Sequence, residues 1–373
     1  MNDNTIIVFG TIHHNTLSMV RSLGEAGLDV VLLLRSDDGG FVSKSKYVKK
    51  CQHVKNEDEL VQFLLVFRSN HPGKGTIITC DDMSAFWIDS HYDELFEGYN
   101  FFNAGGKGRI ASFLDKEKQN ELAKKIGCNV PKSIVVKGGE KAVFNVYPCL
   151  IKPQESINGG KQIHICQNQT ELNDVLSKID GKINVLVEEY LDKESEIVVL
   201  GVSYQGQVIV PGHILKIREN KGGTTYSQVF PIGALDDLSV AKHSKEIIQQ
   251  IGYEGLFGIE FIHNNRGYFY IETNLRNDAT CYALAKAGVN LPKLYVDLVN
   301  GKATLSDYEV PTIEPIYAMV ELKDFRFVMN GKVSFFKWLK QRRGAKCLFY
   351  YSKNDKAPFW SAIKEVLTRP FRK

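Results

Sequence analysis

The stretch FGIEFIHNNRGYFYIETNLRND, residues 257–278, constrains the fold most, because it predicts a β-hairpin that carries a carboxylate inside each strand. Strand-forming residues cover 258–262 and 268–272, and the polar HNNRG between them predicts a turn. Glutamate is depleted in strands and is rarely buried without a partner. Glu260 and Glu272 therefore need an explanation beyond strand formation.

The expected turn spans five residues, 263–267, which pairs Glu260 with Tyr270 and makes Glu272 a diagonal neighbour on the same face. Asn274 continues that face if the strand extends so far. A turn longer or shorter by one residue would place the two glutamates on opposite faces. The apolar residues of the other parity are expected to pack against the core: Ile259, Phe261, Phe269 and Ile271.

These acids have the chemistry of a metal site. Two carboxylates and an amide oxygen form a set of hard ligands that suits Mg²⁺ bridging nucleotide phosphates. Glu260, Glu272 and Asn274 are therefore candidate metal ligands. Paired salt bridges on an exposed sheet face are the alternative explanation for the glutamates.

A strand–helix–strand pattern begins the chain. TIIVFG (5–10) and DVVLLL (29–34) predict strands on either side of a helical stretch, and GTIITCDD (75–82) predicts a strand that ends in carboxylates. Alternating strands and helices predict a parallel sheet with helices on both faces, which is a Rossmann-like α/β domain. The first turn, TIHHN, lacks the G-x-G-x-x-G pattern, so a nicotinamide-dependent oxidoreductase is disfavoured.

In such sheets ligands bind beyond the carboxyl ends of the strands. Polar residues at those positions are candidates for binding a small substrate: Thr11, His13, Asn15, Asp81 and Asp82. Helix capping and turn formation are the alternative roles for each of them.

Two further polar stretches are candidates for nucleotide binding. Lys152 lies in a predicted strand just before the glycine-rich SINGGK (156–161), and a lysine beside such a loop can hold phosphates. VEEYLDKESE (187–196) places acids after a strand, where a hinge can present backbone groups to a purine and a later carboxylate to a ribose. An edge-strand lysine and a solvated turn are the respective alternatives.

The order of four motifs resembles the ATP-grasp superfamily over roughly residues 1–310. The motifs are LDK (114–116), LIKP followed by GGK, VEEYL followed by a glutamate, and GIEF followed by YIETNLR. The E-T-N-x-R pattern after a Glu-bearing strand is the most specific of them. The resemblance implies mixed α/β and α+β architecture, in which a Rossmann-like domain precedes two subdomains that grip ATP.

The resemblance also divides the chain, and the glycine-rich NAGGKGRIA (103–111) marks the first boundary. We expect a pre-ATP-grasp α/β domain over 1–105 and a lid or central subdomain over 106–198. An ATP-grasp C-terminal subdomain is expected over 199–310, followed by a short C-terminal appendage over 311–373.

Roles for individual residues follow from the resemblance. The implied phosphate-binding residues are Lys116, Lys152, Gly159 and Gly160. The implied adenine and ribose contacts are Glu188, Glu189, Tyr190, Leu191 and Glu196. Mg²⁺, or Mn²⁺ in its place, would be ligated by Glu260, Glu272 and Asn274, and Arg276 would stabilise the transferring phosphoryl group or the substrate carboxylate.

A polar segment, RENKGGTTYS (218–227), is expected to form a closing loop. Lys216, Arg218 and Lys221 lie beside or within it, and from there they would reach the γ-phosphate. Solvated loop charges are an equal alternative for these three residues.

The implied reaction is that of an ATP-dependent carboxylate–amine ligase. ATP phosphorylates a small-molecule carboxylate, and an amine displaces phosphate from the acyl phosphate to form an amide. A nucleotide-binding regulatory or scaffold protein that has lost turnover is the alternative.

Two N-terminal stretches narrow the resemblance. NTLSMVRSLGEAGLDVVLL (15–33) and SKSKYV (43–48) resemble the D-aspartate ligase-like carboxylate–amine ligases, which suggests an amino acid or a cell-envelope precursor as substrate. D-Alanine–D-alanine ligases place an arginine two residues before the first metal acid, where this chain has Gly258. That departure counts against a D-alanyl-D-alanine product. A homodimer is also expected by resemblance.

Positive charge is concentrated at the C-terminal end. Residues 337–373 carry eleven Lys/Arg and two Asp/Glu, whereas the remainder of the chain is acidic, so nothing marks the body as a nucleic-acid binder. The basic segment is also aromatic. It is expected to bind an anionic substrate or an anionic membrane surface, and a packed appendage with solvated charges is the alternative.

Cysteine usage and the first residues indicate the compartment. The seven cysteines are scattered without a C-x-x-C pair, which is typical of reduced thiols in a cytoplasmic protein. MNDNTIIVFG has no basic n-region and is not expected to be a signal peptide, and apolar runs such as VVLLL are too short to span a bilayer.

Overall fold

The computed structural model describes residues 6–71, 73–154, 163–220 and 223–368 of the 373-residue chain. Its first layer is a five-stranded parallel sheet of order β3-β2-β1-β4-β5. The strands are β1 (Ile6–Gly10), β2 (Val30–Leu34), β3 (Val48–His53), β4 (Gly75–Thr79) and β5 (Tyr99–Phe101). This sheet is the expected Rossmann-like domain.

Alternating apolar residues let helices cover both faces of this sheet. Ile6 and Val8 pack in one cluster with α1 (His14–Gly24). Ile7 and Phe9 pack on the other face with α2 (Glu57–Ser69), α3 (Asp82–Ser90) and α4 (Tyr92–Leu95). Because β1 and β2 are buried on both faces, their sequences are almost wholly apolar, whereas the edge strand β3, VKKCQH, is mostly polar.

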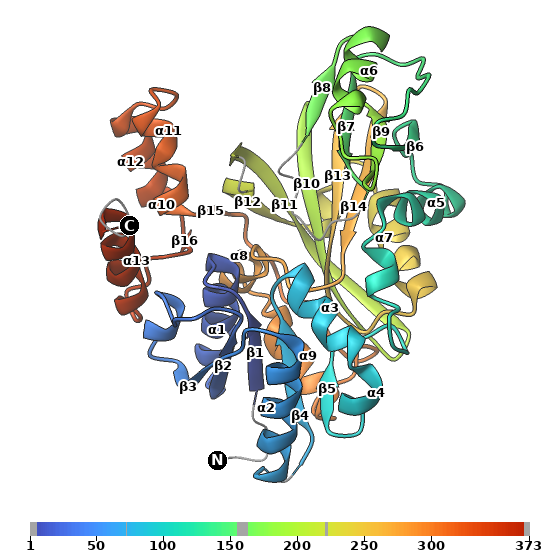
Figure 1. Ribbon diagram of the computed structural model, residues 1–373. Helices are drawn as coiled ribbons and strands as arrows, with labels where there is room; N and C mark the ends of the chain where they lie inside the picture. Colours follow the sequence, from blue (N-terminus) through green and yellow to red (C-terminus); the bar gives the residue numbers. More distant parts are fainter. Residues whose placement is uncertain (1–5, 72, 155–162, 221–222, 369–373) are drawn as a thin grey trace.

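A second sheet has four antiparallel strands in the order β6-β9-β7-β8 and lies at the far end of the molecule from the parallel sheet (Figure 1). The strands are β6 (Ser133–Lys137), β7 (Cys149–Pro153), β8 (His164–Cys166) and β9 (Asn184–Glu189), with helix α6 (Gln169–Ser177) packed on them. Helix α5 (Lys116–Ile126) precedes this sheet. Asp115 caps its first N–H groups, and Gly127, at φ 101°, ends it in a left-handed conformation that glycine adopts without strain.

A seven-stranded sheet lies between these two ends (Figure 1). Its order is β14-β13-β10-β11-β12-β15-β16, and all pairs are antiparallel except the last. The strands are β10 (Ser195–Tyr204), β11 (Gln207–Asn220), β12 (Gly223–Pro231), β13 (Gly255–Asn264), β14 (Gly267–Asn274), β15 (Ile316–Met319) and β16 (Cys347–Leu348). The associated helices are α7 (Ser239–Ile251), α8 (Cys281–Lys286) and α9 (Leu291–Val299).

The expected five-residue hairpin turn is wrong. Asn264 pairs with Gly267, so the loop between β13 and β14 has two residues. Gly267, at φ 100°, supplies the left-handed conformation that closes this shorter turn. A β-bulge then shifts the register between Glu260 and Phe261, so Glu260 lies directly opposite Glu272. The bulge leaves Ile271 half-buried, whereas Ile259, Phe261 and Phe269 are buried as expected.

The expected closing loop over 218–227 is also wrong for the residues that the structure describes. Arg218 ends up in β11, and residues 223–227 belong to β12, which pairs with it antiparallel. Thr224, Thr225 and Tyr226 are residues that favour strands, which accounts for the extended ladder. Lys221 lies outside the described residues.

The C-terminal segment is built into the molecule. Strands β15 and β16 join the seven-stranded sheet, and four helices complete the segment: α10 (Glu321–Asp324), α11 (Arg326–Met329), α12 (Phe335–Gly344) and α13 (Ala357–Thr368). Arg21 of α1 is fully buried and pairs with Asp355 at 2.9 Å. It also donates to the carbonyl oxygens of Phe349 and Tyr350, at 2.8 and 2.9 Å. The segment is therefore anchored on the N-terminal domain.

Candidate active site

Four neighbouring strands each contribute one charged side chain to a single cluster. Glu272 comes from β14, Glu260 from β13, Glu196 from β10 and Lys216 from β11. Lys216 Nζ lies 2.7 Å from Glu260 Oε2 and 2.5 Å from Glu196 Oε1. We call these four residues the carboxylate–lysine cluster. The sheet order brings them together, because the hairpin β13–β14 pairs with the earlier hairpin β10–β11 through β13 and β10, which are not consecutive in the chain.

Burial and mutual charge perturb the carboxyl groups of this cluster in opposite directions. Burial is the main cause that raises the pKa of Glu260; with Glu272 and Glu196 adding to the rise and Lys216 opposing it, that pKa is about 7. Burial also raises the pKa of Glu196, but Lys216 and Lys193 outweigh it and bring that pKa to about 2. Burial lowers the pKa of Lys216, but Glu260 and Glu196 hold it well above its usual range. The cluster thus holds more acid than its lysine neutralises.

Two more predicted lysines lie near the hairpin acids. Lys116, at the start of α5, has its Nζ 3.8 Å from Glu272 Oε2, and burial lowers its pKa. Lys152 on β7 is buried and pairs with Glu188 on β9 at 2.7 Å. Lys152 and Glu188 are close enough to Lys116 to shift its pKa. The structure therefore brings both predicted phosphate-binding lysines to the same side of the site.

Arg276 joins the hairpin to the parallel sheet. Its Nη2 donates to Asn274 Oδ1 at 2.9 Å, and its Nε donates to Asp82, just beyond β4, at 3.0 Å. Burial lowers the pKa of Arg276, but Asp82 and Asp278 raise it above its usual range. Asn15 reinforces this junction by donating to the carbonyl oxygens of Cys80 and Asn277, at 2.6 and 3.0 Å.

A cavity of about 200 Å³ opens at this junction. The charged residues around it include Lys216, Glu260 and Arg276, and His13 and Asn15 line it from the N-terminal domain. Of the other residues at the strand ends, Asp82 holds Arg276, whereas Asp81 caps α3 and bonds Arg35 at 3.1 Å. The Thr11 carbonyl accepts from the N–H of His13 at 2.8 Å, which is a local turn contact.

The predicted adenine hinge follows β9. The N–H groups of Glu189 and Tyr190 already donate to the carbonyl oxygens of Lys132 and Pro148, at 2.8 and 3.0 Å. The Glu189 side chain pairs with Arg266 in the hairpin turn at 2.7 Å, whereas Tyr190 is exposed and Leu191 is buried. A purine bound at this hinge would therefore have to bond to backbone groups other than the N–H groups of Glu189 and Tyr190. Gly159 and Gly160 lie outside the described residues.

Some residues take positions that the sequence did not indicate. Arg218 pairs with Asp324 at 2.8 Å and bonds Gln341 at 3.0 Å, so it holds the C-terminal segment and does not face the cluster. The sequence assigns no role to Asp278 or Lys323, although both are close to the site. Asp278 follows the E-T-N-x-R motif by two residues and is detectable by that adjacency, whereas no spacing signal identifies Lys323.

The hairpin acids fit a divalent cation by donor chemistry. Glu260 and Glu272 face each other across the hairpin, and the negative charge of Glu272 helps to raise the pKa of Glu260. The amide oxygen of Asn274, the atom that would ligate a cation, accepts from Arg276 Nη2 at 2.9 Å. Two carboxylates and an amide are a hard-oxygen set. Over the ranges covered by the structure, no group of three or more His, Cys, Asp or Glu residues is placed to hold a metal ion.

The elements that carry these residues match a known protein family. Residues 121–278 match the family model described as the ATP-grasp domain, so this part of the chain is an ATP-grasp domain. The expected superfamily is confirmed for this part of the chain. The expected ligase class and the expected cofactors, ATP with Mg²⁺ or Mn²⁺, stay predictions and form part of the proposed function.

Curated proteins are similar to about half of this chain. The large chain of carbamoyl phosphate synthase from Clostridium acetobutylicum is 27% identical over 202 residues, which cover 50% of this chain and 19% of that protein. The match thus spans about a fifth of the length of that curated relative.

Two solved structures share the fold. The L-amino acid ligase from Bacillus licheniformis has a TM-score of 0.68 at 15% identity, covering 86% of this chain and 80% of that one. N5-carboxyaminoimidazole synthetase from Staphylococcus aureus, complexed with ADP, has a TM-score of 0.68 at 20% identity, covering 89% and 85%. Both likenesses extend beyond the matched domain, and the expected α/β and α+β fold is confirmed.

Proposed function

We propose that this chain is an ATP-dependent ligase that joins a carboxylate to an amine through an acyl phosphate. The observation that carries the proposal is the meeting of the carboxylate–lysine cluster with Arg276 at a cavity between the ATP-grasp domain and the carboxyl edge of the parallel sheet. Phosphoryl transfer needs positioning and charge neutralisation, which this arrangement supplies.

Nucleotide binding is proposed for the side of the cluster that faces β7 and β9. Lys116 and Lys152 would bind the phosphates, and Glu196 would bind the ribose. Glu260, Glu272 and Asn274 would hold Mg²⁺, which neutralises phosphate charge when bound. Lys216 bridges Glu260 and Glu196, so its ammonium group lies between the proposed metal acids and the proposed ribose acid.

Substrate binding is proposed for the side that faces the N-terminal domain. A carboxylate beside Arg276 attacks the γ-phosphorus, which forms an acyl phosphate and releases ADP. An amine then attacks the acyl carbon, an amide bond forms, inorganic phosphate leaves, and the amine releases its proton. Arg276 is fixed by Asp82 and Asn274, so its position does not depend on a mobile side chain.

The reaction is tested by measuring ADP release from the full chain with Mg²⁺, ATP and a broad panel of amino acids. Release that requires both a carboxylate and an amine supports the ligase. If no pair stimulates release, a nucleotide-binding regulatory or scaffold protein becomes the better assignment.

Metal binding should depend on pH through Glu260. Its pKa of about 7 means that a proton competes with the cation below neutrality, so Mn²⁺ should bind about tenfold more weakly at pH 6 than at pH 8. Electron paramagnetic resonance of Mn²⁺, without nucleotide, measures this affinity. Glu260→Gln should bind weakly at both pH values. Equal wild-type affinity at the two pH values would rule out Glu260 as the titrating ligand.

Membrane contact of the basic segment stays a prediction. Exposed aromatic residues on α12 and α13 (Phe335, Phe336 and Trp360) lie among its lysines and arginines. The chain should co-sediment with phosphatidylglycerol vesicles at low salt and be released by added salt, because surface attraction is screened. No sedimentation at low salt removes the proposal. No helix in the portion covered by the structure is long and apolar enough to cross a bilayer.

A cytoplasmic location and a homodimer also stay predictions. Light scattering after size-exclusion chromatography would determine the oligomeric state. A single species at the mass of one 42.1 kDa chain would contradict the homodimer.

A further inference from the structure

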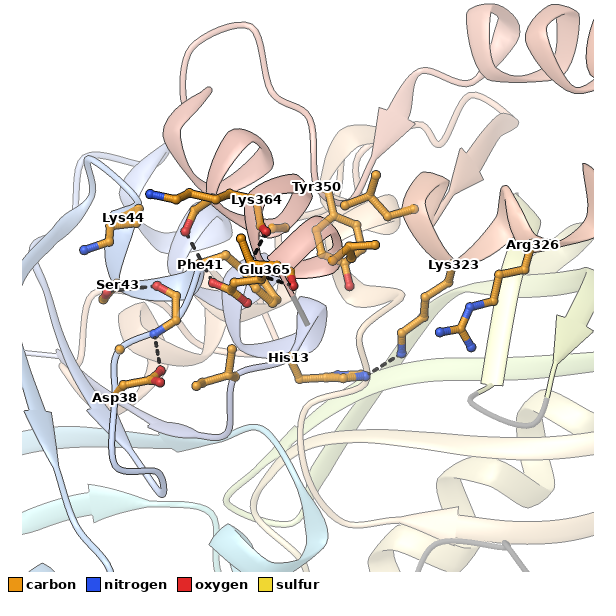
Figure 2. Close-up of a pocket in the computed structure, with 18 residues that line it drawn as sticks. His13, Asp38, Phe41, Ser43, Lys44, Lys323, Arg326, Tyr350, Lys364 and Glu365 are labelled. Carbon is orange, nitrogen blue, oxygen red and sulfur yellow. Dashed lines mark hydrogen bonds between the residues drawn. The ribbon is translucent and has the colours of Figure 1, made fainter. Parts of the chain in front are cut away.

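A second and larger cavity lies beside the proposed active site. It has a volume of about 820 Å³ and lies between residues 38–44 of the N-terminal domain and the C-terminal segment. Figure 2 shows its lining, with Tyr350, Lys364 and Glu365 on the C-terminal side and Asp38, Phe41 and Ser43 on the other. Ligand pockets usually have about 300–1,000 Å³, so this cavity has room for much more than the reacting group of a substrate.

The two cavities share His13. This residue lines the 200 Å³ cavity together with Arg276 and Lys216, and it also lines the larger cavity. It lies between β1 and α1, where ligands approach parallel sheets of this kind. A substrate that reacts beside Arg276 can therefore extend past His13 into the larger space.

Two cations lie where the larger cavity passes His13. The Nζ of Lys323 is 2.9 Å from His13 Nε2, and Arg326 lies beside Lys323, as Figure 2 shows. Both side chains also line a third cavity of about 470 Å³, so they form part of the wall between two open spaces. Among the residues that the structure describes, neither Lys323 nor Arg326 forms an ion pair, and no carboxylate raises the pKa of Lys323.

Uncompensated charge of this kind is unfavourable in the free protein. Burial and, to a smaller extent, the neighbouring Arg326 together lower the pKa of Lys323 to about 8. Two acids line the same cavity, but Asp38 accepts from the N–H of Gly40 at 2.9 Å and Glu365 accepts from Ser361 at 3.3 Å. Two further lysines, Lys44 and Lys364, line the cavity too. An anion placed at Lys323 and Arg326 would relieve their repulsion.

We propose that Lys323 and Arg326 bind a phosphate or carboxylate group of one of the two substrates, at a distance from its reacting group. The inference rests on the proposed ligase function, and it assigns the substrate an anionic extension that occupies the larger cavity. The C-terminal segment then acts as a specificity element, because it carries both cations and one wall of the cavity.

The test is equilibrium binding to the full chain by titration calorimetry, without nucleotide. O-Phosphoserine and serine form one pair of probes, and glutamate and glutamine form the other. In at least one pair the charged probe should bind about tenfold or more tightly than its uncharged mate, because a charge-assisted contact is lost in the mate. Preference within the first pair indicates phosphate, and preference within the second indicates carboxylate.

The double substitution Lys323→Met/Arg326→Met should abolish that preference, and Lys323→Arg should retain it. Lys337→Met/Lys340→Met, on exposed positions of α12, removes the same charge from the same segment and should change nothing. If the first double variant does not fold, the single substitution Arg326→Met can replace it, because Arg326 is exposed. That variant should still bind the charged probe more weakly than the wild type does.

No preference in the wild type, or a preference that survives the double substitution, overturns the proposal. Its failure differs from failure of the ligase assignment. ADP release without a charge preference would support the ligase and contradict the anion subsite. A charge preference without ADP release would support the anion subsite and contradict the ligase.

Discussion

Glu272→Gln should lower substrate-dependent ADP release by about a hundredfold to a thousandfold while leaving the fold intact. Gln keeps the shape of the side chain and removes one negative charge from the proposed metal set. Phosphoryl transfer depends on neutralising phosphate charge, so a weaker hold on the cation should slow the chemical step. The fold should persist because Glu272 is 26% exposed and its pairing with Lys116, at 3.8 Å, is loose.

The matched control is Glu314→Gln. Glu314 is 77% exposed, and its ion pair is with Lys346 at 3.5 Å and not with a residue of the carboxylate–lysine cluster. This change should therefore leave ADP release unaltered. Full activity in Glu272→Gln would contradict a metal role. Lost activity with unchanged Mn²⁺ affinity would instead assign Glu272 to positioning.

The hairpin shows what local patterns could and could not predict. The pattern of strand formers and the two glutamates predicted a strand pair with both acids on one face, and that arrangement is present. The register behind it is different. A two-residue turn would by itself have separated Glu260 from Glu272, and the bulge beside Glu260 restores their facing positions. A bulge depends on packing from both sides of the hairpin, which residue spacing does not reveal.

The lysine of the cluster shows a different limit. The sequence placed Lys216 beside a closing loop, whereas it lies within a long strand and contacts Glu196 and Glu260. Those contacts exist because β10, which carries Glu196, lies between β11 and β13 in the sheet, so the three side chains lie on neighbouring strands. Strand order is a tertiary property, so local periodicity could locate each residue in an element but could not bring the three together.

The C-terminal segment combines both limits. Its basic and aromatic composition is evident in the sequence, but its attachment to the molecule is not. The residue that holds it, Arg21, is separated from Asp355 by 334 positions and belongs to a helix, α1, that is buried along almost its whole length. Lys323 and Arg326 face the large cavity because this attachment fixes the segment against the N-terminal domain.

Arg21→Met should therefore lower the free energy of unfolding by about 3–5 kcal/mol, the cost of breaking a buried ion pair. Asp355 would keep its contacts with Ser45 and the N–H of Lys46, at 2.8 and 3.0 Å, but would lose its buried cation. The carbonyl oxygens of Phe349 and Tyr350 would lose a donor as well. Urea unfolding measures the loss, and hydrogen exchange locates it. Relative to the wild type, the variant should show faster exchange of the amide hydrogens of α13 and little change in those of the four-stranded sheet. The anchor holds the C-terminal segment and not that sheet.

Lys49→Met is the control that separates burial from charge. Lys49 Nζ lies 3.3 Å from Asp29 Oδ1, and the two side chains are 54% and 67% exposed. Breaking this pair should therefore cost no more than about 1 kcal/mol. An equal loss in both variants would mean that the buried pair does not anchor the segment. If Arg21 anchors the C-terminal segment, Arg21→Met should also weaken binding of the charged probes, although Arg21 is not among the residues lining the large cavity. Weaker probe binding together with faster exchange in α13 would tie the proposed anion site to the docking of the C-terminal segment, since one arginine would then control both.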